Sequence, residues 1–285
     1  MHEYFALMID GVAHPIGLMH VDVVQALPWP GCWSVETEKR RITLHGAHDL
    51  DARTKAVEEA LLKGHAANVS PSLRIWQDER FPVYSAAGDR VLDVSGSGVD
   101  VIGARSFAVY LIAWTNTSQG RMYWVQRRGW TKTLSPGMLD CTVSGQLQPD
   151  ELPFDGMVRE SGEEANLPAA LLRERLRPCD ILAAAYPTSS QGAPGYMHHT
   201  AYAYEIELDP EWNPTCDSDE VAEFKSMTLE EVRDGIGQEL FIPVARLVYL
   251  AHFIRQGIVT TENEERLEEV CARLHGRPRL FVPEE

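Results

Sequence analysis

Hydrophobic and polar positions are patterned differently in the first third of the chain and in the rest. Up to about residue 103 the sequence mixes short alternating segments with one helical stretch, 49–62, in which apolar residues recur at helical spacing. Asp49 or Asp51 is suited to cap the start of this helix, and Gly64 follows its expected end. The Ser/Gly-rich run 94–98 predicts a turn or flexible connection, so we place a domain boundary just beyond it.

Beyond the boundary, strand and helix patterns alternate. The strand patterns cover 107–115, 122–127, 141–143, 181–186 and 200–208. The helix patterns cover 152–165, 229–234, 244–256 and 262–274. We therefore expect an α/β or α+β protein, with a smaller N-terminal α+β domain over 1–103 and a second domain over 104–285, in which helices pack on a mixed sheet.

Composition narrows the class of protein. Hydrophobic residues make up 44% of the chain, enough for a substantial core, and no stretch has the roughly 18 consecutive apolar residues of a membrane span. The net charge of −16 opposes nonspecific binding to nucleic acid or to an acidic membrane. The five cysteines are scattered, and no secretory signal is evident, so we expect a cytoplasmic protein, as a monomer or a homodimer.

Candidate chemistry is concentrated in one acidic helix. Glu160, Glu163 and Glu164 stand at i, i+3 and i+4, so a helix places them together, where like charges repel unless a partner is present. Hard carboxylate oxygens of this kind suit Mg²⁺ or Mn²⁺. Arg159 is suited to pair with Glu151 and to fix the corner between loop and helix. A solvated acidic helix face is the alternative, and it is the commoner origin of an isolated cluster.

The spacing of this stretch resembles the Nudix box, usually written G-x5-E-x7-R-E-U-x-E-E-x-G-U, where U is aliphatic. The matching residues are Gly145, Glu151, Arg159, Glu160, Glu163, Glu164 and Leu167. The departures are Ser161, where an aliphatic residue is usual, and Asn166, where glycine is usual. Asparagine tolerates a left-handed conformation, so Asn166 is a suitable substitute at the end of a helix.

The flanking sequence resembles one Nudix subgroup with an extra N-terminal domain. The similar segments are 73–79 with 82–84, 123–128, 131–133, 136–140, 219–224 and 253–257. The subgroup includes fungal and plant Nudix hydrolases associated with thiamine diphosphate metabolism. The resemblance implies a Nudix α/β/α sandwich and metal-dependent hydrolysis of thiamine diphosphate, or of its oxidised analogues, to a monophosphate and phosphate. One departure is Ser144, because the subgroup usually has a double glycine there.

The resemblance also implies roles for individual residues. The expected metal site comprises Glu160, Glu163 and Glu164 with Gly145 beside them, holding Mg²⁺ or Mn²⁺. The expected catalytic residues are Glu163, Glu164, Arg159 and Glu220, with the general base either a box glutamate or Glu220. Residue chemistry, rather than the resemblance, gives the expected substrate-binding residues. Arg127, Arg128 and Lys132 form a local basic segment suited to the diphosphate, with ordinary surface charge as the alternative. Trp130 and Tyr196 are suited to stacking, with core packing as the alternative.

Two alternatives to the thiamine hypothesis stay open. A prenyl or terpenyl diphosphate would use the same chemistry with a different organic group, and an apolar pocket would favour it. A non-catalytic diphosphate-binding module is the other alternative, and the presence of every box glutamate argues against it.

Overall fold

The computed structural model describes residues 3–118 and 120–276, and the chain divides into two compact units. The first unit contains 3–106 together with 185–199, and the second contains the described residues of 107–184 and 200–276. The predicted division into domains 1–103 and 104–285 stays a prediction. The structure adds that residues 185–199 group with the first unit.

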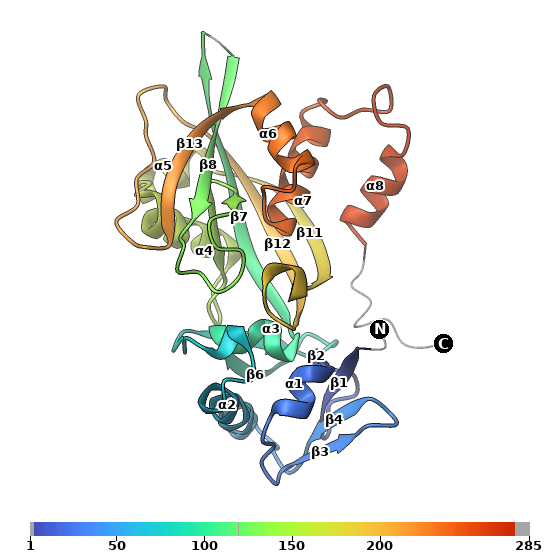
Figure 1. The fold of residues 1–285 in the computed structure, drawn as a ribbon. Coiled ribbons are helices and arrows are strands. Elements are labelled where there is room, and N and C mark those ends of the chain that lie inside the picture. Colours follow the sequence, from blue (N-terminus) through green and yellow to red (C-terminus); the bar gives the residue numbers. More distant parts are fainter. Residues whose placement is uncertain (1–2, 119, 277–285) are drawn as a thin grey trace. The chain divides into compact units, whose positions relative to one another are not determined.

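The first unit is built on a mixed sheet in the order β2-β1-β4-β3 (Figure 1). Its strands are β1 (Tyr4–Ile9), β2 (Gly17–His20), β3 (Trp33–Glu36) and β4 (Arg41–Leu44), with β1 and β4 parallel and the other pairs antiparallel. A hairpin of β5 (Arg80–Tyr84) and β6 (Arg90–Ser95) adds a second sheet. The helices are α1 (Val21–Ala26), α2 (Leu50–Ala66) and α3 (Val99–Ile102).

Helix α2 confirms the helix expected at 49–62, but it continues to Ala66. The Asp49 side chain caps it by accepting a hydrogen bond from the backbone N–H of Ala52 at 2.8 Å. The expectation that Gly64 follows the helix was wrong, because Gly64 lies inside it and is buried. A Cβ at Gly64 would lie 2.6 Å from Leu27 Cδ2, so packing rather than termination explains this glycine.

The turn or flexible connection expected at 94–98 is confirmed as a turn. Strand β6 runs to Ser95, and a 3₁₀ turn follows at Gly96–Gly98. The Ser97 hydroxyl oxygen accepts the backbone N–H of Gln77 at 2.9 Å, and Ser97 is buried. This hydrogen bond ties the run to another segment of the first unit.

A seven-stranded sheet lies mainly in the second unit, although the ends of three of its strands group with the first unit within the described residues. Its main order is β11 (Arg177–Pro187), β12 (Tyr196–Glu207), β7 (Arg105–Thr117), β8 (Gly120–Arg128) and β13 (Val221–Thr228). Two short strands join its middle: β9 (Leu139–Asp140) pairs with β8, and β10 (Val143–Gln146) pairs with β7. The pairs β7–β8, β8–β13, β8–β9 and β7–β10 are antiparallel.

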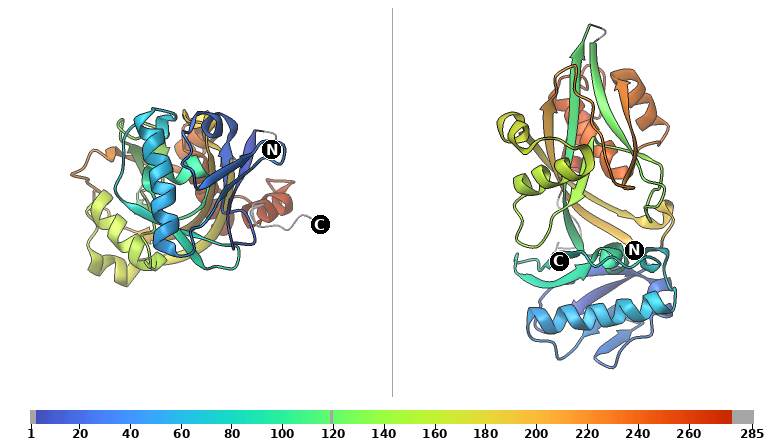
Figure 2. Two further views of the ribbon diagram at one scale, coloured as in Figure 1. Left: turned by 90° about the horizontal axis from the view of Figure 1, so that it is seen from below. Right: turned by 90° about the vertical axis from the view of Figure 1, so that its left-hand side faces the viewer.

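Helices cover both faces of this sheet (Figure 2). On one face lie α4 (Pro153–Ala165) and α5 (Ala169–Arg175); on the other lie α6 (Leu229–Gly237) and α7 (Pro243–Arg255), and α8 (Leu267–Leu274) follows. Side chains alternate between the two faces of the sheet along β7, so Val109 and Leu111 point to the same face. There they share a core cluster with Met157 of α4. On β8, Tyr123 meets Tyr249 of α7 edge to face. The predicted α/β class, with helices on both faces of the sheet, is confirmed.

Several predicted elements need correction. The strand expected at 141–143 falls on the break between β9 and β10, where the Thr142 side chain bridges β7 and β8 by accepting from Ala113 N and donating to Trp124 O. Helix α5 and strand β13 were not predicted, and β13 begins within the segment 219–224 that resembles the subgroup. The last helix begins at Leu267, five residues later than expected. In the described part of the chain, no helix is both long and apolar enough to cross a membrane.

Candidate active site

Helix α4 carries the predicted metal-binding carboxylates. It begins with Pro153, which suits a first helical position, and it ends at Ala165. Asn166 follows as the cap, and its φ of 50° is the left-handed conformation expected there. Glu160 and Glu164 are buried against the unit, whereas the Glu163 side chain is 59% exposed. The helix therefore presents two sheltered carboxylates and one solvent-facing carboxylate.

Gly145 allows Glu160 to approach the sheet closely. Gly145 lies on β10 and pairs with Val109 of β7. A Cβ at this position would lie 1.8 Å from Glu160 Cδ, far inside any real contact. The glycine of the box is therefore needed because the Glu160 carboxylate occupies the space that a side chain would take.

Arg159 ties the start of the loop to the carboxylate cluster. Its Nε and Nη2 donate to the two carboxylate oxygens of Glu151 at 2.8 and 2.9 Å, which confirms the predicted pair. Its Nη1 donates to Glu160 at 2.8 Å and to Glu163 at 3.1 Å. A planar guanidinium serves several carboxylates at once, so Arg159 holds the cluster together. Glu151 first, and then Glu160, raise the pKa of Arg159, while burial opposes them.

Glu164 is the most deeply buried of the three glutamates. Its Oε2 accepts the backbone N–H of Ser144 at 2.9 Å and the side-chain N–H of Gln126 at 3.4 Å. Burial raises the pKa of Glu164 to about 8; the negative charge of Glu160 adds to this, while Lys132 opposes it. A carboxyl group with these surroundings is stabilised in its charged form by an added cation.

The predicted basic residues are each held by an acid. Arg127 contacts Glu223 at 2.7 Å, and Lys132 contacts Glu220, the candidate base on the loop before β13, at 3.0 Å. Arg128 turns inward to Asp140 at 3.1 Å. Of these three basic residues, Lys132 is the one whose positive charge lowers the pKa of Glu164, against the effect of burial.

The predicted aromatic residues lie in different units. Trp130 is 71% exposed, and its indole packs over Gly137, where a Cβ would lie 2.1 Å from Cζ3. Tyr196 belongs to the first unit, where its ring meets that of Tyr4 edge to face at 5.3 Å. Trp130 therefore offers an open aromatic face within the unit that holds the carboxylates.

Two polar residues beneath Glu164 were not among the predicted site residues. Gln126 lies on β8 and is 1% exposed, and Asp140 on β9 is fully buried. Side chains alternate along β8, so Gln126 lies on the same side of the sheet as Trp124. Polar residues are uncommon in buried strands, and this was the one feature of the sequence that could have indicated a role for Gln126.

The donor set fits a hard divalent cation, although the described side chains do not form a ready-made cage. Glu160, Glu163 and Glu164 supply only carboxylate oxygens, which Mg²⁺ and Mn²⁺ prefer. Within residues 3–118 and 120–276, no three His, Cys, Asp or Glu side chains converge tightly enough to hold a metal ion. Arg159 stands between Glu160 and Glu163 and supplies the positive charge there.

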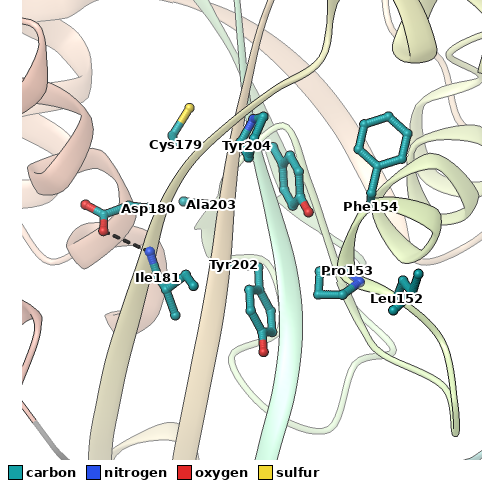
Figure 3. A pocket seen from close by; sticks show the side chains of 10 residues that line it. Leu152, Pro153, Phe154, Cys179, Asp180, Ile181, Tyr202, Ala203 and Tyr204 are labelled. Atoms are coloured by element: carbon teal, nitrogen blue, oxygen red, sulfur yellow. Dashed lines mark hydrogen bonds between the residues drawn. The ribbon is translucent and has the colours of Figure 1, made fainter.

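An apolar pocket of about 560 Å³ lies within the second unit, between the start of α4 and strands β11 and β12 (Figure 3). Phe154 and Tyr204 meet edge to face on its wall at 6.4 Å. The lining residues are Leu152, Pro153, Phe154, Pro178, Cys179, Asp180, Ile181, Tyr202, Ala203 and Tyr204. None of the box glutamates lines it.

Comparison with known proteins agrees with the box. An uncharacterized protein of Saccharomyces cerevisiae is 24% identical over 84% of this chain and 72% of its own length. Nudix hydrolase 20, chloroplastic, of Arabidopsis thaliana is 24% identical over 79% of this chain. The chain spans 58% of that plant protein, and 58% of Nudix hydrolase 24, chloroplastic, of the same plant.

Solved structures give weaker likenesses. A protein of Deinococcus radiodurans has a TM-score of 0.46 and 20% identity, covering 61% of this chain and 99% of its own. An Ap4A hydrolase of C. elegans has a TM-score of 0.38 and 15% identity, covering 54% of this chain and 97% of its own. The family assignment rests on sequence instead. Residues 105–247, half of the chain, match the NUDIX domain model. The chain therefore belongs to the Nudix family, and the predicted enzyme class, a hydrolase of diphosphate bonds, is confirmed.

Proposed function

We propose that this protein hydrolyses a small organic diphosphate to a monophosphate and phosphate with the help of Mg²⁺ or Mn²⁺. The observation that carries the proposal is the carboxylate cluster of α4: Glu160 and Glu164 are sheltered, Glu163 faces solvent, and Arg159 binds two of them. Such a cluster is costly for the fold unless a cation and phosphate oxygens use it.

In this proposal the three glutamates of α4 hold the cation, with Gly145 leaving room for Glu160. The bound cation supplies positive charge for the phosphate oxygens and lowers the pKa of water. Water attacks phosphorus, the bridging P–O bond breaks, and the proton from water passes to a glutamate. Glu163, Glu164 and Glu220 are the candidates for that base, and Glu220 becomes available when Lys132 exchanges it for phosphate.

Arg127 and Lys132 are the proposed diphosphate contacts, and Trp130 is the proposed stacking partner of the organic group. Each basic side chain is bound to an exposed acid, Glu223 or Glu220, so an anionic substrate can displace the acid at little cost. For Arg128 we propose an indirect contribution, because its guanidinium is bound to the buried Asp140. For Tyr196 the proposed stacking stays a prediction.

We further propose thiamine diphosphate or its oxidised analogues as the substrate. The subgroup resemblance of the flanking segments supports this choice, and so does the exposed indole of Trp130, which suits a flat cationic heterocycle. We infer that residues 1–103 form an accessory domain of this enzyme.

A prenyl diphosphate is the second candidate, and the apolar pocket beside Phe154 favours it. Leu152 and Ile181 at this pocket are 67% and 60% exposed, so they offer apolar surface to a hydrocarbon chain.

The test is hydrolysis by the full chain with Mg²⁺ or Mn²⁺ over a panel of diphosphates. The panel contains thiamine diphosphate, its oxidised analogues, geranyl and farnesyl diphosphate, and ADP-ribose. Phosphate release is measured, and the organic product is identified by mass spectrometry, with Glu164→Gln as the inactive control. Turnover of thiamine compounds supports the first candidate, and preference for a prenyl diphosphate supports the second. Tight binding without turnover of any member would overturn the proposed hydrolysis.

A further inference from the structure

A continuous chain of hydrogen bonds lies beneath Glu164. Gln126 Nε2 donates to Ser144 Oγ at 3.3 Å, and the Ser144 hydroxyl donates to Asp140 Oδ2 at 3.0 Å. The backbone N–H of the same serine donates to Glu164 Oε2 at 2.9 Å. Ser144 therefore links a buried aspartate to the most buried box glutamate.

The donors around Asp140 fix its role as an acceptor. Its Oδ1 accepts the backbone N–H of Cys141 at 2.7 Å, and its Oδ2 accepts Arg128 Nη1 at 3.1 Å as well as the Ser144 hydroxyl. Since Gln126 already donates to Ser144 Oγ, the serine proton is directed to Asp140. The Cys141 N–H, the Arg128 guanidinium and the Ser144 hydroxyl thus all donate to Asp140, and this arrangement favours its carboxylate form.

Stability alone does not explain a buried carboxylate here. Asp140 is 0% exposed, and a buried ion pair such as Asp140–Arg128 contributes little net stability, because desolvation offsets the attraction. The pair does connect several elements, since Arg128 Nη2 also binds the carbonyl of Leu134 in the loop after β8. Asp140 also adds negative charge near Glu164, and this charge helps to raise the pKa of Glu164.

We propose that Asp140 is a positioning residue of the metal site: through Ser144 it holds the Glu164 carboxylate in place to bind the cation. The proposal rests on the proposed function, because it assigns a cation to Glu164. Groups that orient metal ligands from behind typically change metal affinity by about 10- to 100-fold when they are replaced.

The experiment measures Mn²⁺ affinity by isothermal titration calorimetry on the full chain without substrate. Asp140→Asn should weaken Mn²⁺ binding about tenfold or more, while circular dichroism shows a folded protein. The matched control is Asp100→Asn, which removes another buried aspartate, 4% exposed, in the first unit. This control should leave the Mn²⁺ affinity unchanged.

A second measurement separates positioning from general loosening of the fold. If Asp140 acts through Glu164, Asp140→Asn should have no further effect on Mn²⁺ affinity in a Glu164→Gln background. If Asp140→Asn does not fold, Ser144→Ala replaces it and should weaken binding about threefold, the loss expected for one hydrogen bond.

The outcomes are distinguishable. Wild-type affinity in a folded Asp140→Asn, or in Ser144→Ala where that variant replaces it, would overturn the inference and leave the proposed function intact. Equal losses in the presence and absence of Glu164 would overturn it too, because they indicate a structural role. Absence of Mn²⁺ binding by the wild-type chain would overturn the proposed function together with this inference.

Discussion

Both compact units bury an aspartate, but the two are surrounded differently. In the first unit, Asp100 receives a hydrogen bond from the Ser72 hydroxyl at 2.7 Å and no ion pair among the described residues. In the second unit, Asp140 is held by Arg128 and by Ser144, which leads on to Glu164. Burial raises the pKa of both aspartates, so a shifted pKa alone does not mark a functional site. The distinguishing feature of the second unit is a hydrogen-bonded path from the buried Asp140 through Ser144 to Glu164, a member of the carboxylate cluster of α4.

The largest expected effect comes from breaking the end of that path. Glu164→Gln removes a charge but keeps an acceptor for the N–H of Ser144, so the fold should persist with unchanged or slightly higher stability. Hydrolysis should fall roughly a hundredfold or more, because cation binding contributes several kcal/mol to this chemistry. Steady-state phosphate release and thermal melting measure the two effects.

The matched control for Glu164→Gln is Asp155→Asn, which removes an exposed acid from the same helix. It should leave turnover within about twofold of the wild type, since exposed charges contribute little. A comparable loss in both variants would show that the net charge of α4, not the position of Glu164, governs activity.

Asp100→Asn tests whether the buried aspartate of the first unit affects stability alone and not hydrolysis. Burial raises the pKa of Asp100 to about 6 from 3.8, so the folded state binds a proton more tightly than the unfolded state. Its contribution to stability is therefore present below pH 3.8 and is lost as pH rises through 6. The variant should gain up to about 3 kcal/mol relative to the wild type between pH 4 and pH 7, with unchanged hydrolysis.

This prediction needs a difference measurement. His198 and His199 are buried in the same unit, and burial lowers the pKa of each to about 4, so they destabilise the fold as pH falls from 6.5 toward 4. Their effect opposes that of Asp100 in the same pH range. The free energy of unfolding in urea is measured for the wild type and for Asp100→Asn at each pH, and the difference between them removes the contribution of the histidines. A difference that does not change with pH would contradict the assignment to Asp100.

Gly145→Ala tests whether the sheet and α4 are as close as the structure indicates. The new Cβ would lie 1.8 Å from Glu160 Cδ, so Glu160 must move, at an expected cost of about 1–3 kcal/mol and with a loss of turnover. The control is Gly162→Ala on α4, the helix that carries Glu160, because nothing lies within 4 Å of a Cβ at position 162. That control should gain up to about 1 kcal/mol in helix propensity. Equal melting temperatures for the two variants would contradict the close approach.

The sequence predicted the elements whose patterns are local. The box spacing placed α4, the Arg159–Glu151 pair and the left-handed Asn166, because each depends on a single turn or helix. Strand β13 was missed, because the exposed Ala222 and Glu223 hide its pattern. Gly64 was misassigned for a related reason: glycine signals a helix end locally, but here it makes room for residues distant in the chain.

The hydrogen-bond path beneath Glu164 was beyond local reasoning too. Gln126, Asp140 and Ser144 come from three strands, and only the pairing of β8 with β9 and the adjacent course of β10 bring them together. A polar residue in an otherwise buried strand was the one available signal, and it does not identify its partner.

Trp130→Ala gives the smallest expected effect and decides which organic group the second unit accepts. The indole is 71% exposed, so its removal should change the free energy of unfolding by no more than about 0.5 kcal/mol. If the indole stacks on a cationic heterocycle, KM for a thiamine-type diphosphate should rise about tenfold with little change in kcat. KM for a prenyl diphosphate should stay the same, since a flexible chain gains less from the aromatic face. An equal rise for both classes would indicate that Trp130 shapes the loop through Gly137, while no rise for either would remove it from the substrate site.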